Sequence, residues 1–83
     1  MKTNDLKRGA FVRLRNGWSA EIMDNMRGNI RLAKVYGDFT DIGSVYSHDI
    51  AWVCIDKSED LWEPIEHTTA QLKLKDQLSR IGF

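Results

Sequence analysis

Apolar and polar residues alternate in residues 10–15 and again in residues 18–23, which is the pattern of β-strands with one buried face. The residues between these segments include Asn16 and Gly17, a pair typical of the turn in a β-hairpin. The two segments therefore predict a hairpin of two antiparallel strands.

The length of the hairpin loop decides which side chains share a face of the sheet. A two-residue loop would place Arg15 opposite Trp18 and put arginine side chains among the apolar ones. A three-residue loop instead pairs Val12 with Ala20, so that the apolar residues stay together. Such a loop is a type I turn followed by a bulge, with Gly17 in the left-handed conformation. We predict the three-residue loop.

The next strand is expected to follow a five-residue loop at residues 24–28, which is rich in turn-forming residues. This loop length pairs Glu21 with Arg31 on the polar face, where the opposite charges support the pairing. It also turns Ile30 and Leu32 toward the core.

The remaining strands are expected between clusters of turn residues. The most strongly β segment is residues 50–55, an unbroken apolar run. The expected order is a third strand at 29–36, a longer loop at 37–43, a short strand at 44–46, a bend at 47–49, the strand at 50–55, a polar loop at 56–60 and an edge strand at 61–65.

The C-terminal segment has the period of an amphipathic helix, expected at residues 69–81. Thr68 and Gln71 form a capping box at its start. We expect Gly82 to end the helix and Phe83 to fold back onto apolar neighbours. The apolar stripe of the helix consists of Ala70, Leu74, Leu78 and Ile81.

Together these elements predict a mainly β fold with one C-terminal α-helix. The first choice is a small SH3-like antiparallel barrel of about five strands. The alternative is a curled sheet packed on the helix. We expect a single domain over residues 1–83, with the barrel at about 6–66 and the helix at about 69–81.

Composition narrows the classes of function. The chain has 83 residues, 12 of them basic and 12 acidic, whereas proteins that coat nucleic acid tend to carry a basic excess. Its Trp, Phe and Tyr residues are the expected bulky core. The longest apolar run is too short to span a bilayer, and the first residues lack the apolar core of a secretory signal. With a single cysteine, Cys54, these features predict a cytoplasmic protein and no membrane partner.

Few residues in the chain suit catalysis. Cys54 lies in an apolar run and is expected in the core. Asp49 could orient the imidazole of His48, but the simpler interpretation is that Asp49 makes a turn hydrogen bond while His48 is solvated. His67 is expected to pack before the helix cap. We therefore expect no enzymatic activity, no cofactor and no metal site.

Binding is the function that these residues suit better. Basic residues concentrate in the first half of the chain, and we expect them on the solvent face of the first strands. They could hold phosphates or an acidic protein surface, although mixed charge on such a face often serves solubility alone. Aromatic residues near loops are candidate anchors. The candidate binding residues are Arg13, Arg15, Arg31, Lys34, Tyr36, Phe39, His48 and Trp62.

Four stretches of this chain resemble a family of small uncharacterised bacteriophage and prophage proteins. They are VRLRNGWSAEIMDN, VYG, GSVYSHDI and EHTTAQLKL, and the resemblance extends from Leu6 to Phe83. Residues 6–12 are also similar to the start of many SH3-like barrels. The resemblance implies a biological context and carries over no catalytic residue.

That context favours a non-enzymatic accessory protein that binds a protein or protein complex of the bacterial host. The partner implied is a component of a defence system such as CRISPR–Cas, with the chain acting as its inhibitor. The alternative is an SH3-like module that binds nucleic acid through the basic sheet face. A structural or assembly protein is a third hypothesis, and the sequence leaves the oligomeric state open.

Overall fold

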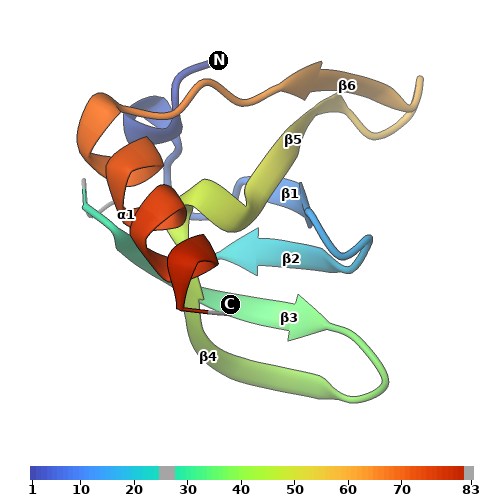
Figure 1. The fold of residues 1–83 in the computed structure, drawn as a ribbon. Coiled ribbons are helices and arrows are strands. Elements are labelled where there is room, and N and C mark those ends of the chain that lie inside the picture. The colour runs from blue at the N-terminus through green and yellow to red at the C-terminus, as the bar shows by residue number, and fades with distance from the viewer. Residues whose placement is uncertain (25–27, 82–83) are drawn as a thin grey trace.

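A computed structural model describes residues 1–24 and 28–81 (Figure 1). Within these residues, six strands form one antiparallel sheet and one α-helix follows them, which confirms a mainly β fold with a C-terminal helix. The strands are β1 (Phe11–Leu14), β2 (Ser19–Ile22), β3 (Ile30–Tyr36), β4 (Thr40–Tyr46), β5 (Ile50–Asp56) and β6 (Leu61–Pro64). The helix α1 spans Thr69–Arg80, and two short 3₁₀ helices are η1 (Thr3–Asp5) and η2 (Ser47–Asp49).

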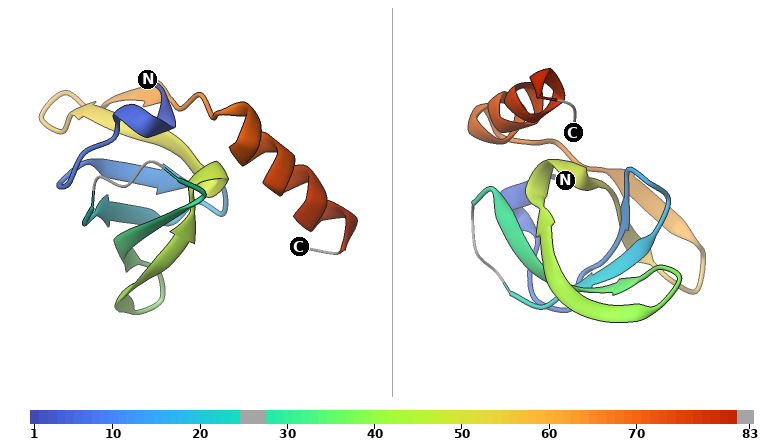
Figure 2. Two further views of the ribbon diagram at one scale, coloured as in Figure 1. Left: turned by 90° about the vertical axis from the view of Figure 1, so that its left-hand side faces the viewer. Right: turned by 60° about the horizontal axis from the view of Figure 1, so that its bottom comes forward.

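The sheet curls around its own axis but does not close. Its strand order is β4-β3-β2-β1-β5-β6, so β4 and β6 are its two edges. Figure 2 shows the curl from one end and α1 extending away from it. We call the concave side the inner face and the convex side the outer face. The buried residues of the inner face include Val12, Leu14, Ala20, Ile22, Ala33 and Val53.

The first hairpin has the predicted three-residue loop. Val12 lies opposite Ala20, and the N–H of Gly17 donates to the carbonyl of Leu14 at 3.0 Å. Gly17 has φ +92°, a conformation that costs little only for glycine. This loop length is what keeps the apolar residues of β1 and β2 on the inner face.

The predicted pairing of the second hairpin is wrong by three residues. Glu21 lies opposite Lys34 rather than Arg31. A shift by an odd number exchanges the two faces of a strand, so Arg31 turns inward while Ile30 and Leu32 turn outward. The pairing extends further because the N–H of Leu32 donates to the Asp24 carboxylate at 2.8 Å. Part of the predicted loop, residues 25–27, lies outside the described residues.

The expected long loop at residues 37–43 is also wrong. The strand β4 already begins at Thr40, and its seven residues pair with β3 without a bulge. Asp41 and Gly43 have low intrinsic preference for strands, but pairing with a neighbouring strand overrides that preference. The hairpin loop is therefore much shorter than predicted.

The strand β5 contains a bulge that changes the face of its side chains. Arg13 lies opposite Trp52 and Leu14 lies opposite Ile50, so Ala51 is the extra residue. As a result, Ile50 is buried while Trp52, two positions later, is exposed on the outer face.

The core consists of small and medium aliphatic side chains rather than aromatic ones. Its buried members are Leu6, Val12, Leu14, Ala20, Ile22, Ala33, Ile50, Val53 and Ile65. All three tryptophans belong to the described residues, and each is exposed or half-buried, so the expectation of an aromatic core is wrong. The interior of such a tightly curled sheet has limited room, which favours aliphatic side chains over the bulky indole rings.

The helix α1 begins at the predicted capping box. The Gln71 N–H donates to the Thr68 hydroxyl at 3.2 Å, and the Thr68 N–H donates to the Gln71 side chain at 2.9 Å. The apolar stripe is only partly used, because Ala70 and Ile81 are exposed while Leu74 and Leu78 are half-buried.

The helix is anchored instead by the buried side chain of Gln71. Its amide donates to the Gly28 carbonyl at 2.9 Å and to the Asn4 side chain at 3.3 Å. The expected roles of Gly82 and Phe83 lie outside the described residues. In the described part of the chain, no helix is long and apolar enough to cross a membrane.

Candidate functional site

An aromatic cluster covers the outer face of the sheet. Phe11 lies at its centre, with its ring centroid 6.2 Å from that of Tyr36 and 6.1 Å from that of Trp62. These three residues come from β1, β3 and β6, so the cluster extends over most of the sheet. Trp52 lies opposite Arg13 in the neighbouring strand and is 44% exposed. We call Phe11, Arg13, Lys34, Tyr36, Trp52, Lys57 and Trp62 the aromatic face.

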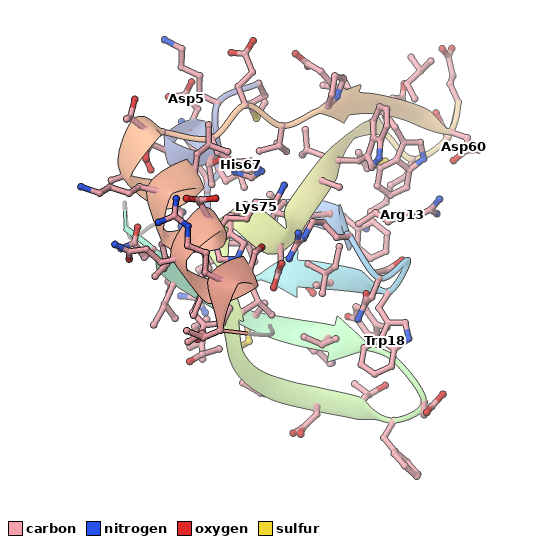
Figure 3. The ribbon with its side chains drawn as sticks, in the orientation of Figure 1. Asp5, Arg13, Trp18, Asp60, His67 and Lys75 are labelled. Atoms are coloured by element: carbon pink, nitrogen blue, oxygen red, sulfur yellow. The ribbon has the colours of Figure 1, made fainter. Side chains whose placement is uncertain are left out.

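Three cations lie over the rings of the aromatic face. The guanidinium of Arg13 is 4.7 Å from the centroid of Trp62, and Figure 3 shows Arg13 on the same side of the molecule as Asp60. The ammonium groups of Lys57 and Lys34 are 4.6 Å from Phe11 and 5.8 Å from Tyr36. Each such contact contributes about 0.5–1 kcal/mol at an exposed site. The cations therefore orient and partly cover the rings without burying them.

Two hydrogen bonds fix the edges of the aromatic face. The indole N–H of Trp62 donates to the Asp60 carboxylate at 2.7 Å, and the Tyr36 hydroxyl donates to Glu21 at 3.5 Å. Asp60 has φ +54°, a conformation that asparagine and aspartate tolerate better than most residues. These carboxylates give the face mixed charge instead of a uniformly positive field.

Four of the eight predicted binding residues belong to the aromatic face, namely Arg13, Lys34, Tyr36 and Trp62. Two others, Arg15 and Phe39, lie at a separate groove described below. Arg15 is bound there, because its Nε donates to Asp49 Oδ1 at 2.8 Å. The remaining two, Arg31 and His48, are buried.

Arg31 is the main error in the predicted basic surface, because its side chain is fully buried. Its Nη2 donates to the Thr3 carbonyl at 3.1 Å, and its Nε donates to the Ser47 hydroxyl at 3.3 Å. Burial lowers the pKa of Arg31, and the charge of Asp24 partly opposes that effect. Arg31 therefore joins the N-terminal segment to β3 and η2 and is not available to a partner.

His48 is also buried, so the interpretation that it is solvated is wrong. Its ring stacks on Tyr46 with centroids 5.1 Å apart, and its Nε2 is 3.7 Å from Asp49 Oδ1. Burial lowers the pKa of His48, and the charge of Asp49 opposes that effect. The Asp49 carboxylate binds Arg15 rather than making the expected turn bond. These contacts assign His48 a packing role at η2.

His67 and Cys54 likewise have structural surroundings. His67 Nδ1 is 2.7 Å from the hydroxyl of Thr3, which ties the segment before α1 to the N-terminus. Cys54 lies opposite Trp62 and is half-buried on the outer face, not in the core as expected. In the ranges 1–24 and 28–81, no three His, Cys, Asp or Glu side chains are grouped to hold a metal ion.

Three residues of the aromatic face were missed by the sequence analysis. Phe11 alternates with Val12 and so belongs with Arg13, a signal that the sequence does contain. The face on which Trp52 lies depends on the bulge at Ala51, which the alternation of apolar and polar residues does not reveal. Lys57 lies in a loop and reaches Phe11 only through the fold.

The aromatic face has the composition of a binding surface. Tryptophan, tyrosine and arginine dominate the energetically important positions of protein interfaces. Aromatic rings next to cations also suit stacking with nucleotide bases. Comparison of this chain with protein-family models, with curated proteins and with solved structures finds no match.

Proposed function

We propose that this chain is a non-enzymatic bacteriophage or prophage accessory protein that binds a protein of its bacterial host in the cytoplasm. The resemblance to phage proteins supports the biological context. One observation carries the binding role, namely that the aromatic rings of the sheet lie on the outer face, exposed at Trp52 and Tyr36 and half-buried at Phe11 and Trp62, while the core is aliphatic. Leaving such side chains in water has a cost that a partner surface would remove.

The chemistry of the aromatic face describes the partner surface. Trp52 and Trp62 supply apolar anchors, and Arg13, Lys34 and Lys57 supply positive charge around them. A complementary surface has an apolar centre with carboxylates at its rim. A component of a defence complex such as CRISPR–Cas, inhibited by occlusion of that surface, is the partner that the phage context favours.

The test compares capture by matched variants. The tagged chain is incubated with lysate of a bacterial host, and the captured protein is purified for calorimetry. Trp52→Ala should weaken its binding by about 2 kcal/mol, roughly thirtyfold. Leu72→Ala is the control, because Leu72 is 47% exposed on α1 and belongs to neither the aromatic face nor the groove described below. Undiminished binding by Trp52→Ala and Arg13→Ala would show that the aromatic face is not the binding surface.

Nucleic-acid binding is the second candidate function. The cations over the rings of Phe11, Tyr36 and Trp62 support it, because single strands bind through stacking and phosphate contacts together. A fluorescent single-stranded oligonucleotide should then bind at low salt, and Arg13→Ala and Lys34→Ala should each reduce the salt dependence by about one phosphate contact. Absence of binding at low salt would remove this function.

A further inference from the structure

A groove opens at the end of the sheet where the β1–β2 and β3–β4 loops lie, and its volume is about 690 Å³. Leu14, Val35 and Val45 supply its apolar lining. The β1–β2 loop forms one wall and includes Trp18, which Figure 3 shows at this end of the molecule. Trp18 lies over Gly37, where an added Cβ would come within 2.6 Å of the indole ring. The groove is thus lined by packed side chains and is separate from the aromatic face.

The opposite wall of the groove is the free edge of β4. Four consecutive residues, Gly43–Tyr46, line the groove. Side chains of a strand alternate between its two faces, so a run of consecutive residues meets the groove with the edge of the strand. The groove therefore offers backbone groups as well as side chains.

The hydrogen-bond pattern shows which backbone groups of β4 point into the groove. The Ser47 N–H donates to the Asn29 carbonyl at 2.8 Å, and the Gly37 N–H donates to the Phe39 carbonyl at 3.2 Å. In an antiparallel pair, bonded and non-bonded positions alternate. Both bonds join odd-numbered residues in the register of the β3–β4 pair, so the odd-numbered residues of β4 are the ones bonded to β3. The N–H and C=O groups of Ile42 and Ser44 therefore point away from β3. Accordingly, the Ile42 N–H is bound by its neighbour Asp41 at 2.9 Å and not by β3.

The two edges of the sheet differ in how they are protected against pairing. The strand β6 is four residues long and ends at Pro64, and the N-terminal segment bonds to the chain just beyond it through Glu66. The strand β4 has seven residues, no proline, no bulge in its pairing with β3 and a single charge, Asp41. Proteins usually blunt such an edge, so an unblunted one suits the addition of a strand.

The walls of the groove select a lone extended segment as its occupant. The β4 edge of a second copy would bring its own β3 alongside, about 4.8 Å further from β4, whereas the β1–β2 loop bounds the groove on that side. The charged residues that line the groove, among those the structure describes, are Arg15, Asp41 and Asp49. Because Arg15 and Asp49 bind each other, Asp41 leaves the groove with a net negative charge, which favours a basic segment.

We propose that the groove binds an extended peptide segment of a partner protein, which adds to β4 as a further strand. Alternate apolar side chains of the segment contact Leu14, Val35 and Val45, and a lysine or arginine meets Asp41. This site goes beyond the proposed function, because it lies on a different surface from the aromatic face.

The test selects short random peptides from a displayed library against the folded chain. Enriched peptides should alternate apolar and polar residues and carry a basic one. Ser44→Pro removes the N–H that points into the groove and should weaken their binding about tenfold or more. Ser44→Ala retains that N–H and should bind normally, as should Trp52→Ala on the aromatic face.

A second variant, Gly43→Val, tests the proposal independently in case Ser44→Pro does not fold. A Cβ at Gly43 meets no atom within 4 Å and Gly43 lines the groove, so Gly43→Val is chosen to add a side chain there. It should abolish peptide binding while circular dichroism stays unchanged. The proposal is overturned if no peptide is enriched or if selected peptides bind Gly43→Val undiminished. It is also overturned if sedimentation shows a dimer that Ser44→Pro dissociates, because β4 would then pair with a second copy.

Discussion

The two faces of the sheet use side chains of opposite size. The inner face contains Ala20, Ala33 and Val12, which are fully buried, whereas the outer face exposes Trp52 and Tyr36. The inside of a tightly curled sheet offers limited volume, so aliphatic side chains fill most of it and the tryptophans lie outside, while Arg31 is a large side chain that turns inward. In this fold, therefore, a large apolar side chain marks a surface more often than the core.

The largest expected effect on stability distinguishes Ile50 from Trp52, which lies two positions later in β5. Ile50→Ala should lower the free energy of unfolding by about 2–5 kcal/mol, because it leaves a cavity among buried residues. Trp52→Ala, on the opposite face, should change it by less than about 1 kcal/mol. Urea denaturation followed by circular dichroism measures both. An equal loss in the two variants would mean that Trp52 belongs to the core and is not a binding residue.

The two arginines of the inner and outer faces give the next comparison. Arg31→Ala should destabilise the fold by roughly 2–4 kcal/mol, because the Thr3 carbonyl and the Ser47 hydroxyl lose a buried donor. Arg13→Ala removes one contact with the half-buried ring of Trp62 and should cost about 0.5–1 kcal/mol. Thermal unfolding of both variants tests this order. If Arg13→Ala were the more damaging change, the assignment of the two faces would be wrong.

The stability of the fold should depend on Gly17, the glycine of the β1–β2 turn that sets which side chains share a face. Gly17→Ala forces a left-handed conformation on alanine and should cost about 1–2 kcal/mol. Gly43→Ala is the matched control, since its Cβ meets open space and its backbone is not left-handed, so stability should be equal or slightly higher. Chemical denaturation distinguishes the two. A neutral Gly17→Ala would contradict the three-residue loop.

The smallest effect concerns His48, which stacks on Tyr46 and is influenced by the charges of Asp49, Arg15 and Lys75. Burial lowers its pKa below the ordinary 6.5, so the folded state binds a proton more weakly than the unfolded state. The contribution of neutral His48 to the free energy of unfolding should be fully present above pH 6.5 and should decrease as the pH falls below 6.5.

Urea midpoints measured about one pH unit above and below that value test this dependence. His48→Phe keeps the stacking on Tyr46 without a titrating group and should reduce the decrease. His67, whose pKa burial also lowers, accounts for a remaining part in the same direction. An unchanged pH dependence in His48→Phe would show that His48 does not contribute to it.

Local interactions account for the features that the sequence alone determined. The three-residue loop at Gly17 follows from one turn residue and two alternating segments, and the capping box of Thr68 and Gln71 from two residues one helical turn apart. The mainly β fold with a C-terminal helix follows from the change of period along the chain. Each of these signals lies within a few neighbouring residues, so no distant contact was needed to interpret it.

Tertiary structure alone decided the second hairpin, the aromatic face and the groove. Both faces of residues 29–36 carry apolar side chains, so alternation did not determine whether Arg31 or Leu32 turned inward. Acceptors at Thr3 and Ser47, both distant in sequence, are what make a buried Arg31 tolerable. The bulge at Ala51 likewise exists only in the pairing with β1 and moves Trp52 to the outer face. Which side chains reach a partner was therefore set by contacts between strands, which the linear pattern does not contain.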